Sequence, residues 1–188
     1  MKDDFNLIIC GIGGQGIITL TRVIAEAFLI EKKEVKSSQV HGLSQRGGSV
    51  LTHLRAGKNI YSPLIKEKGA DLILALELQE LIRNLKWVNK KTFILADKKI
   101  IKISPQTKQE KIINFLTSNF KKLKLIEAEK IARENFQNPV LAGTILLSFA
   151  VKRKILPLKE NSIILAFKKI FPKKISELNK KAFYFKLK

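Results

Sequence analysis

The chain has 188 residues, which is long enough for one domain with a buried core and short for two. Hydrophobic residues make up 45% of it, and the formal net charge at pH 7 is +20. No stretch reaches the roughly 18–20 apolar residues of a membrane span, and the first apolar run is too short for a signal peptide. We therefore expect a single domain, residues 1–188, located in the cytoplasm without membrane contact.

The N-terminal part of the chain predicts strands, one helix and a hairpin. Residues 5–10, FNLIIC, predict a buried strand, and residues 16–31 predict a helix because their apolar positions recur at helical spacing. A short strand at 34–38 follows, and this strand–helix–strand start predicts a parallel pair with a right-handed crossover. Residues 49–57 and 60–65 predict two strands joined by a three-residue turn, which would form a hairpin.

The rest of the chain continues the alternation of strands and helices. Two apolar runs, residues 70–76 and 92–97, predict further buried strands. The remaining segments predict helices at about 77–86, 107–120, 139–153 and 158–171, strands at 100–104 and 123–128, a short helix to about 135, and a last helix or turn at 173–183. This order predicts a three-layer α/β/α fold with a Rossmann-like start, a mostly parallel, mixed sheet and a helical C-terminal third.

The sequence GIGGQG follows the first predicted strand and matches the dinucleotide-binding fingerprint. A ligand could approach its backbone closely, and the following helix N-terminus offers N–H groups to an anion. A dinucleotide site also needs an acid at the end of the second strand, where this chain has the sequence KSS. A packing turn and an anion- or partner-binding loop therefore both rank above an NAD or FAD site. The candidate residues are Gly11, Gly13, Gly14, Gln15 and Gly16.

A second polar loop, residues 39–49, contains the sequence VHGLSQRGGS. By strand order we expect it at the same carboxyl end of the sheet as the glycine loop, where ligands bind in open α/β sheets. An imidazole there could titrate near neutral pH, and a guanidinium could clamp a carboxylate or phosphate. The loop is interpreted either as part of a substrate or cofactor site or as a subunit interface. Its candidate residues are His41, Gln45, Arg46, Gly47 and Gly48.

Four other residues have a plainer interpretation. Cys10 is the only cysteine, so it excludes an internal disulfide and any all-cysteine zinc or iron–sulfur site made by this chain alone, and we expect it to be a small buried apolar residue. His53 alternates with apolar neighbours on a strand, which favours packing over ligation. Trp87 is expected to anchor a core or an interface. Asp97 ends a strand at a suitable place for a site, although acids are common there.

The positive charge does not by itself indicate nucleic-acid binding. Residues 1–60 hold eight basic and five acidic residues, and residues 61–188 hold 28 and 11. Only six of the 36 basic residues are arginines, which base readout and bidentate phosphate contacts favour. Scattered lysines are typical of a solvated surface, and an acidic protein partner is the alternative interpretation.

Several motifs, taken together, resemble a known family. They are GIGGQGI after the first strand, VHGLSQRGGSV about 30 residues later, YSPLI, NPVLAG and, near the C-terminus, ELNKKAF. In this order they are similar to the gamma-type subunits of 2-oxoacid:ferredoxin oxidoreductases. The HGLSQRGGS version most resembles the small, beta subunit of indolepyruvate ferredoxin oxidoreductase. The likeness covers nearly the whole chain, and the stretch 98–125 contributes least to it.

The resemblance implies a subunit of an assembly that decarboxylates a 2-oxoacid, makes an acyl-CoA and reduces ferredoxin. It implies that thiamine diphosphate, Mg²⁺ and the iron–sulfur clusters belong to a large partner subunit, and that CoA is a cosubstrate. No cofactor would be held by this chain, which would be inactive alone. The resemblance assigns no catalytic residue. The two loops would face the partner or line the approach to its active site.

Two interpretations from other classes remain open. One is a free-standing nucleotide- or anion-binding regulatory α/β module, which tight nucleotide binding by the isolated chain would favour. The other is a basic nucleic-acid-binding protein, which strongly salt-dependent DNA or RNA binding would favour. The sequence leaves the 2-oxoacid open, with indolepyruvate and other aryl pyruvates ahead of branched-chain substrates and pyruvate.

Overall fold

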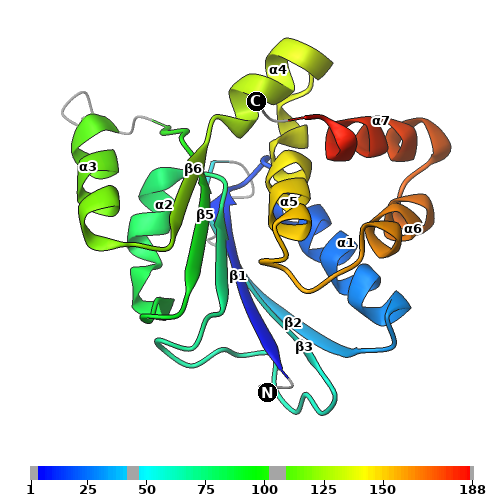
Figure 1. Cartoon of the computed structure of the whole chain (residues 1–188), viewed down its shortest axis with the longest axis horizontal. Helices are drawn as coiled ribbons and strands as arrows, with labels where there is room; N and C mark the ends of the chain where they lie inside the picture. Colours follow the sequence, from blue (N-terminus) through cyan, green and yellow to red (C-terminus); the bar gives the residue numbers. More distant parts are fainter. Residues whose placement is uncertain (1–3, 42–46, 102–108, 187–188) are drawn as a thin grey trace.

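The chain folds into one six-stranded sheet with helices on both faces. The computed structural model describes residues 4–41, 47–101 and 109–186, and the strand order is β2-β3-β1-β4-β5-β6. Figure 1 shows α2 and α3 on one side of the sheet and α1, α5, α6 and α7 on the other. The predicted three-layer arrangement, mixed sheet and helical C-terminal region are therefore confirmed.

The described strands and helices follow the predicted order closely. The strands are β1 (Phe5–Ile12), β2 (Glu34–His41), β3 (Ser49–Gly57), β4 (Leu72–Ala75), β5 (Phe93–Asp97) and β6 (Leu123–Ile126). The α-helices are α1 (Ile17–Ile30), α2 (Leu78–Arg83), α3 (Gln109–Asn119), α4 (Ala128–Phe136), α5 (Ala142–Lys152), α6 (Glu160–Ile170) and α7 (Lys173–Tyr184). Two short 3₁₀ turns, Leu85–Trp87 and Pro139–Leu141, precede β5 and α5.

The N-terminal strand lies at the centre because it is apolar on both faces. Seven of the eight residues of β1 are buried, as expected for a strand covered by helices on each side. Helix α1 turns one apolar stripe, which includes Leu20, Ile24 and Phe28, into the core. Along one of its edges β1 pairs in parallel with β4. β4 pairs in parallel with β5, and β5 pairs in parallel with β6.

The hairpin forms between a different pair of strands from the predicted one. β2 pairs antiparallel with β3 along its whole length, and β3 pairs antiparallel with β1. The predicted parallel pair of the first two strands is therefore wrong: β2 runs parallel to β1, but β3 lies between them. The predicted pairing of 49–57 with 60–65 is also wrong.

Residues 60–65 form no strand because side chains, and not a neighbouring strand, bind their backbone groups. The Ile60 N–H donates to the Glu34 carboxylate at 2.8 Å, and the Ile65 N–H donates to His53 Nδ1 at 3.2 Å. Arg55 Nη1 donates to the Ser62 carbonyl at 3.0 Å. The strand predicted at 100–104 is not formed at its first two residues, and the rest lies outside the described residues.

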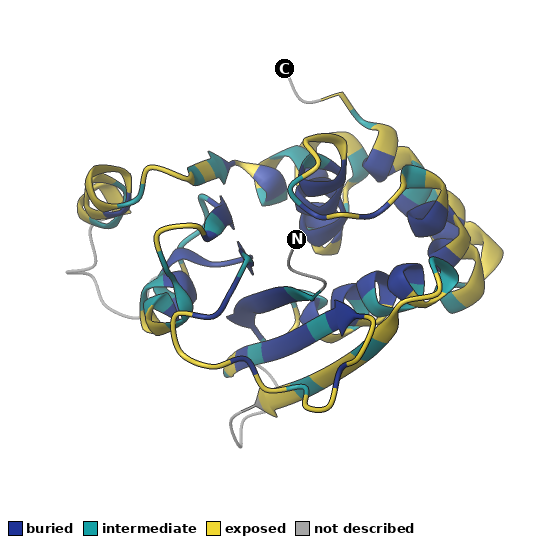
Figure 2. Cartoon of the chain, turned by 60° about the horizontal axis from the view of Figure 1, so that its bottom comes forward, coloured by how far each residue is buried: buried dark blue, intermediate teal, exposed yellow. Residues whose placement is uncertain are grey.

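The core lies on both faces of the sheet, and the outer strand of the hairpin is left uncovered. The larger apolar cluster joins β1 and β4 to α1, α5, α6 and α7, and the smaller one joins the opposite face to α2 and α3. Figure 2 shows buried residues along the central strands and exposed residues along the hairpin edge. Among the described helices, none has the length and apolar character needed to cross a bilayer.

Candidate functional site

The glycine loop meets the start of β3, where the polar loop ends, at the carboxyl end of β1. The Gly13 N–H donates to the Gly48 carbonyl at 2.8 Å, and Ser49 lies opposite Ile12 in the β1–β3 ladder. His41 is the last residue of β2 and lies opposite Val50. The structure therefore brings the glycine loop together with the described end of the polar loop. Residues Gln45 and Arg46 lie outside the described residues.

Gln15 braces the glycine loop from inside. Its Oε1 accepts the Ile12 N–H at 2.7 Å, and its Nε2 donates to the Leu76 carbonyl at 2.9 Å. A Cβ at Gly11 would lie 2.6 Å from Gln15 Oε1, which is closer than atoms can pack. The Gln15 amide thus ties the loop to the end of β4, and Gly11 leaves the space in which that amide lies.

Two further glycines satisfy backbone requirements of the turn. Gly14 and Gly16 have φ values of 99° and 78°, in the left-handed region that favours glycine. A Cβ at Gly16 would also lie 2.9 Å from Val140 Cγ1, because the segment before α5 passes over the start of α1. The glycine spacing therefore has a packing explanation within this chain, whether or not a ligand or partner also contacts the loop.

A pair of buried carboxylates, which the sequence analysis did not single out, lies beside this loop. Glu77 is 0% exposed and Glu80 is 1% exposed. Glu77 caps α2 by accepting the Glu80 N–H at 2.8 Å, and it also accepts the Ile101 N–H at 3.0 Å. Burial raises the pKa of Glu77, and these backbone N–H groups oppose the rise. An acid directly after a buried strand and at the start of a helix was the available signal.

Glu80 connects the start of β3 to α2. Its carboxylate accepts the Ser49 hydroxyl at 2.5 Å and Arg83 Nη1 at 2.5 Å. Together, Glu80 and Glu77 therefore join three segments at this end of the sheet: the start of β3, the start of α2 and the chain after β5. The acid pair thus ties together the segments that border the glycine loop and the start of β3.

Cys10 is a packing residue, as expected. It is fully buried, and burial, followed by the negative charges of Glu80 and Glu77, raises the pKa of its thiol. A thiol held in the neutral form is a poor nucleophile and a poor metal ligand. The residues of this chain therefore do not fit an iron–sulfur cluster, whose ligands are thiolates. In the described parts of the chain, no three His, Cys, Asp or Glu side chains gather to hold a metal ion.

The other candidates of the sequence analysis have structural roles. Asp97 is 2% exposed and accepts the Ala128 and Glu129 N–H groups at 3.0 Å each, so it caps α4. Burial raises the pKa of Asp97 to about 6, partly offset by these N–H groups. His53 lies 4.8 Å, edge to face, from the ring of Trp87. Burial, and then the charge of Lys86, lowers the pKa of His53.

The arrangement suits positioning and docking better than bond-making by this chain alone. The edge offers backbone groups, a braced turn and buried acids whose oxygens are already occupied by hydrogen bonds. Within the described residues, Ser49 supplies the one hydroxyl at this end of the sheet that contacts a carboxylate. It donates to Glu80, whose carboxylate also pairs with Arg83. These contacts hold the start of β3 against α2.

Comparisons with known proteins show the family to which the chain belongs. The family model described as pyruvate ferredoxin/flavodoxin oxidoreductase matches residues 6–184. The chain is 29% identical to the indolepyruvate oxidoreductase subunit IorB of Methanothermobacter thermautotrophicus, over 96% of this chain and 94% of that one. It is 28% identical to the pyruvate/ketoisovalerate oxidoreductases common subunit gamma of Pyrococcus abyssi, over 92% and 89%.

A solved structure shares the fold. The pyruvate oxidoreductase subunit PORC of Thermotoga maritima superposes with a TM-score of 0.72 at 17% identity, covering 97% of this chain and 94% of that one. At this identity the likeness concerns the fold alone. It extends over the central sheet and the helical C-terminal region together.

Proposed function

The chain belongs to the pyruvate ferredoxin/flavodoxin oxidoreductase family, among its gamma-type subunits, and is a subunit of a 2-oxoacid:ferredoxin oxidoreductase; from this premise we propose that its complex oxidises indolepyruvate or another aryl pyruvate. The match to an indolepyruvate oxidoreductase subunit over almost the full length of both chains supports this choice. In the proposed reaction the 2-oxoacid loses CO₂, its acyl group passes to the sulfur of CoA, and the electrons released pass to ferredoxin.

The proposed division of labour leaves the cofactors with the partner. A large subunit would carry thiamine diphosphate, Mg²⁺ and the iron–sulfur clusters, with CoA as cosubstrate of the complex. The lone, buried Cys10 supports this division, because clusters need several thiolates. This chain would contribute the glycine loop and the polar loop to the partner interface or to the approach to the active site.

One observation carries the role proposed for the loops. The base of the polar loop is held twice, by the Gly13–Gly48 hydrogen bond and by the Ser49–Glu80 contact. A functional loop needs a support that fixes its ends, and these two contacts fix the described end of the polar loop next to the glycine loop.

The test is a substrate panel on the assembled complex. The chain is co-produced with its large subunit, and 2-oxoacid-dependent ferredoxin reduction is measured with indolepyruvate, phenylpyruvate, pyruvate, 2-oxoisovalerate and 2-oxoglutarate. We expect the highest kcat/KM with an aryl pyruvate and no turnover by the isolated chain. A higher kcat/KM with pyruvate, 2-oxoisovalerate or 2-oxoglutarate would overturn the proposed substrate, and turnover by the isolated chain would overturn the division of labour.

A further inference from the structure

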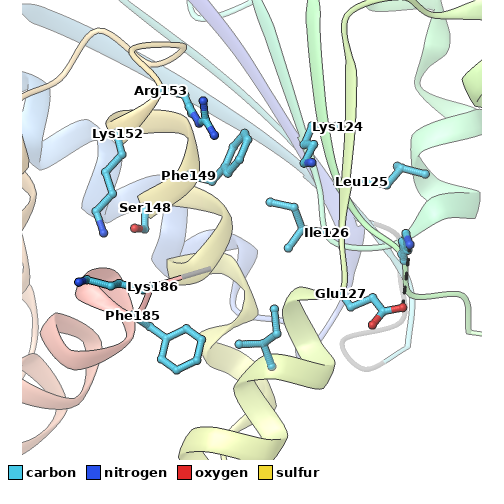
Figure 3. Close-up of a pocket in the computed structure, with 12 residues that line it drawn as sticks. Lys124, Leu125, Ile126, Glu127, Ser148, Phe149, Lys152, Arg153, Phe185 and Lys186 are labelled. Carbon is cyan, nitrogen blue, oxygen red and sulfur yellow. Dashed lines mark ion pairs between the residues drawn. The ribbon is translucent and has the colours of Figure 1, made fainter. Parts of the chain in front are cut away.

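A large basic pocket lies beside β6, the outer strand of the sheet at the edge opposite the hairpin β2–β3. It has a volume of about 850 Å³ and lies between β6, α5 and the residues that follow α7. Figure 3 shows Phe149, Ser148 and Lys152 from α5 facing Lys124 and Ile126 from β6 across it. The proposed function makes no use of this pocket.

The lining of the pocket is strongly positive. One acid, Glu127, lies at its rim, and its Oε1 pairs with Lys98 Nζ at 4.0 Å. Within the described parts of the chain, the other basic groups of the lining form no ion pair. The basic residues of the lining are Lys98, Lys124, Lys152, Arg153 and Lys186. The pocket thus concentrates part of the +20 charge around one acid.

The positive groups surround an aromatic ring. Lys124 Nζ lies 6.0 Å and Arg153 Cζ lies 5.6 Å from the centre of the Phe149 ring. Lys152 Nζ donates to the Phe183 carbonyl at 3.0 Å, which directs its ammonium group to one side of the pocket. The pocket therefore offers an apolar floor between cations, a combination that suits a ligand with both acidic and apolar side chains.

The pocket also borders an open strand edge. In the described part of the chain, β6 is the last strand of the sheet. The Lys122 carbonyl accepts the N–H of Ile94 in β5, and the Ile126 carbonyl accepts the N–H of Lys98, the residue after β5. The alternation of a parallel ladder therefore turns the backbone groups of Leu123 and Leu125 away from β5, to the open edge of β6. Residues 124–127 line the pocket one after another, which brings their backbone to its border.

These features favour an extended chain over a phosphate. The cations come from different elements, and only one is an arginine, the residue suited to a bidentate grip on phosphate. The nearest helix N-terminus, that of α4, is already occupied by the Asp97 carboxylate. A strand added to an open edge gains main-chain hydrogen bonds and places alternate side chains towards one face.

We propose that an extended acidic segment of a partner protein binds along the free edge of β6, with its acidic side chains among the cations and an apolar side chain on Phe149. The occupant is defined by charge complementarity with the lining and by the open edge. This site is independent of the proposed substrate, since it lies at the opposite edge of the sheet from the polar hairpin.

The first experiment uses a fluorescent peptide of about eight residues, with alternating Glu and Val, and the full-length chain. We expect saturable binding by fluorescence anisotropy that is weakened at least about tenfold by Lys124→Glu with Arg153→Glu. The matched control, Lys168→Glu with Lys174→Glu, makes the same change of net charge at exposed positions outside the pocket and should weaken binding less than about twofold. Equal weakening by both pairs, or no saturable binding, would overturn the proposal.

The second experiment tests strand addition. A peptide with alternating Glu and Pro keeps the charges but lacks the N–H group of every second residue, and its Pro rings prevent the regular pairing of a strand. We expect it to bind at least about fivefold more weakly, and we expect the Glu-Val peptide to slow amide exchange at Leu123 and Leu125. Equal affinity of the two peptides, or unchanged exchange at both amides, would show that the cations bind any polyanion and that no strand is added.

Discussion

At the scale of single residues, the glycine loop shows how a nucleotide-like motif serves internal packing. The side chain of Gln15 fills the space beside Gly11 and bonds both β1 and the end of β4. Motif spacing alone cannot show this, because the direction of the glutamine side chain depends on a strand 61 residues away. The geometry of the glycine loop is therefore explained first by contacts that stabilise the fold, and it does not by itself indicate a ligand.

The dependence of Gly11 on Gln15 can be measured by a double-mutant cycle. We expect Gly11→Ala to destabilise the chain by about 1–3 kcal/mol, because its Cβ would overlap Gln15 Oε1. In a Gln15→Ala background the same change should cost at least about 0.5 kcal/mol less. Urea unfolding of the four proteins gives the coupling. Additive costs would mean that Ile17 and Leu76, which also lie near that Cβ, set the requirement for glycine.

Asp97 predicts a specific pH dependence of stability. The pKa of its carboxyl is raised to about 6 in the folded chain, above the ordinary value of 3.8, so the folded state binds this proton more readily than the unfolded state does. Its contribution to stability therefore declines as pH rises from about 4 to 6 and is constant above that window, with a change of up to about 3 kcal/mol.

Asp97→Asn removes this titration and keeps one oxygen to accept an α4 N–H. The difference in unfolding free energy between the native chain and the variant, measured in urea at pH 4, 5, 6 and 7, should move in favour of the variant up to pH 6. Effects of His53 and Glu77 are common to both proteins and cancel. A difference that stays constant from pH 4 to 7 contradicts the raised pKa.

At the scale of secondary-structure elements, the hairpin β2–β3 was the part of the fold that local sequence predicted least well. The apolar runs at 5–10, 70–76 and 92–97 became β1, β4 and β5 because a buried strand needs little beyond its own residues. Residues 49–57 and 60–65 both alternate like strands, but side chains of Glu34, His53 and Arg55 decide that the second one is not. Those contacts join residues 7 to 26 positions apart through particular side-chain orientations, which periodicity cannot detect.

The candidate site shows the same division. That the two loops share one end of the sheet could be expected, since both follow strands that run in the same direction. The support beside them could not, because Glu77 after the strand predicts a helix cap but gives no sign that Glu80, one turn later, binds Ser49.

The contact between Ser49 and Glu80 should affect function more than stability. Ser49→Ala leaves Glu80 paired with Arg83, so we expect a loss of only about 1 kcal/mol in unfolding free energy. Loosening the base of the polar loop should lower kcat/KM of the assembled complex about fivefold or more. Ser37→Ala, in the exposed part of β2, is the matched control and should leave both quantities unchanged. Equal activity of the two variants would mean that the Ser49–Glu80 contact plays no part in function.

At the scale of the whole molecule, strand order bears directly on nucleotide binding. A dinucleotide lies across neighbouring parallel strands, with an acid at the end of the second strand holding the ribose. Here β3 separates β1 from β2 and runs in the opposite direction. The last residues of β2, Gln39, Val40 and His41, also include no acid.

We therefore expect the isolated chain to bind NAD with a Kd weaker than about 1 mM, which corresponds to about −4 kcal/mol or less favourable. Isothermal titration calorimetry with NAD and with FAD measures this directly. Gln15→Ala is an informative second protein, since it empties the space beside Gly11 without supplying the missing acid, and it should bind no better. A Kd in the low micromolar range for the native chain would mean that the strand order tolerates a dinucleotide.

The position of β3 between β1 and β2 also has a consequence for how the chain reaches its folded state. β2 and β3 are separated by a short connection, so their ladder closes a small loop, whereas β1 must find β3 across α1 and β2, and β4 across the whole hairpin. Closing the larger loops costs more chain entropy. We expect the hairpin and α1 to organise first, and β1 to enter the sheet late, as the strand on which the antiparallel and parallel halves of the protein are finally joined.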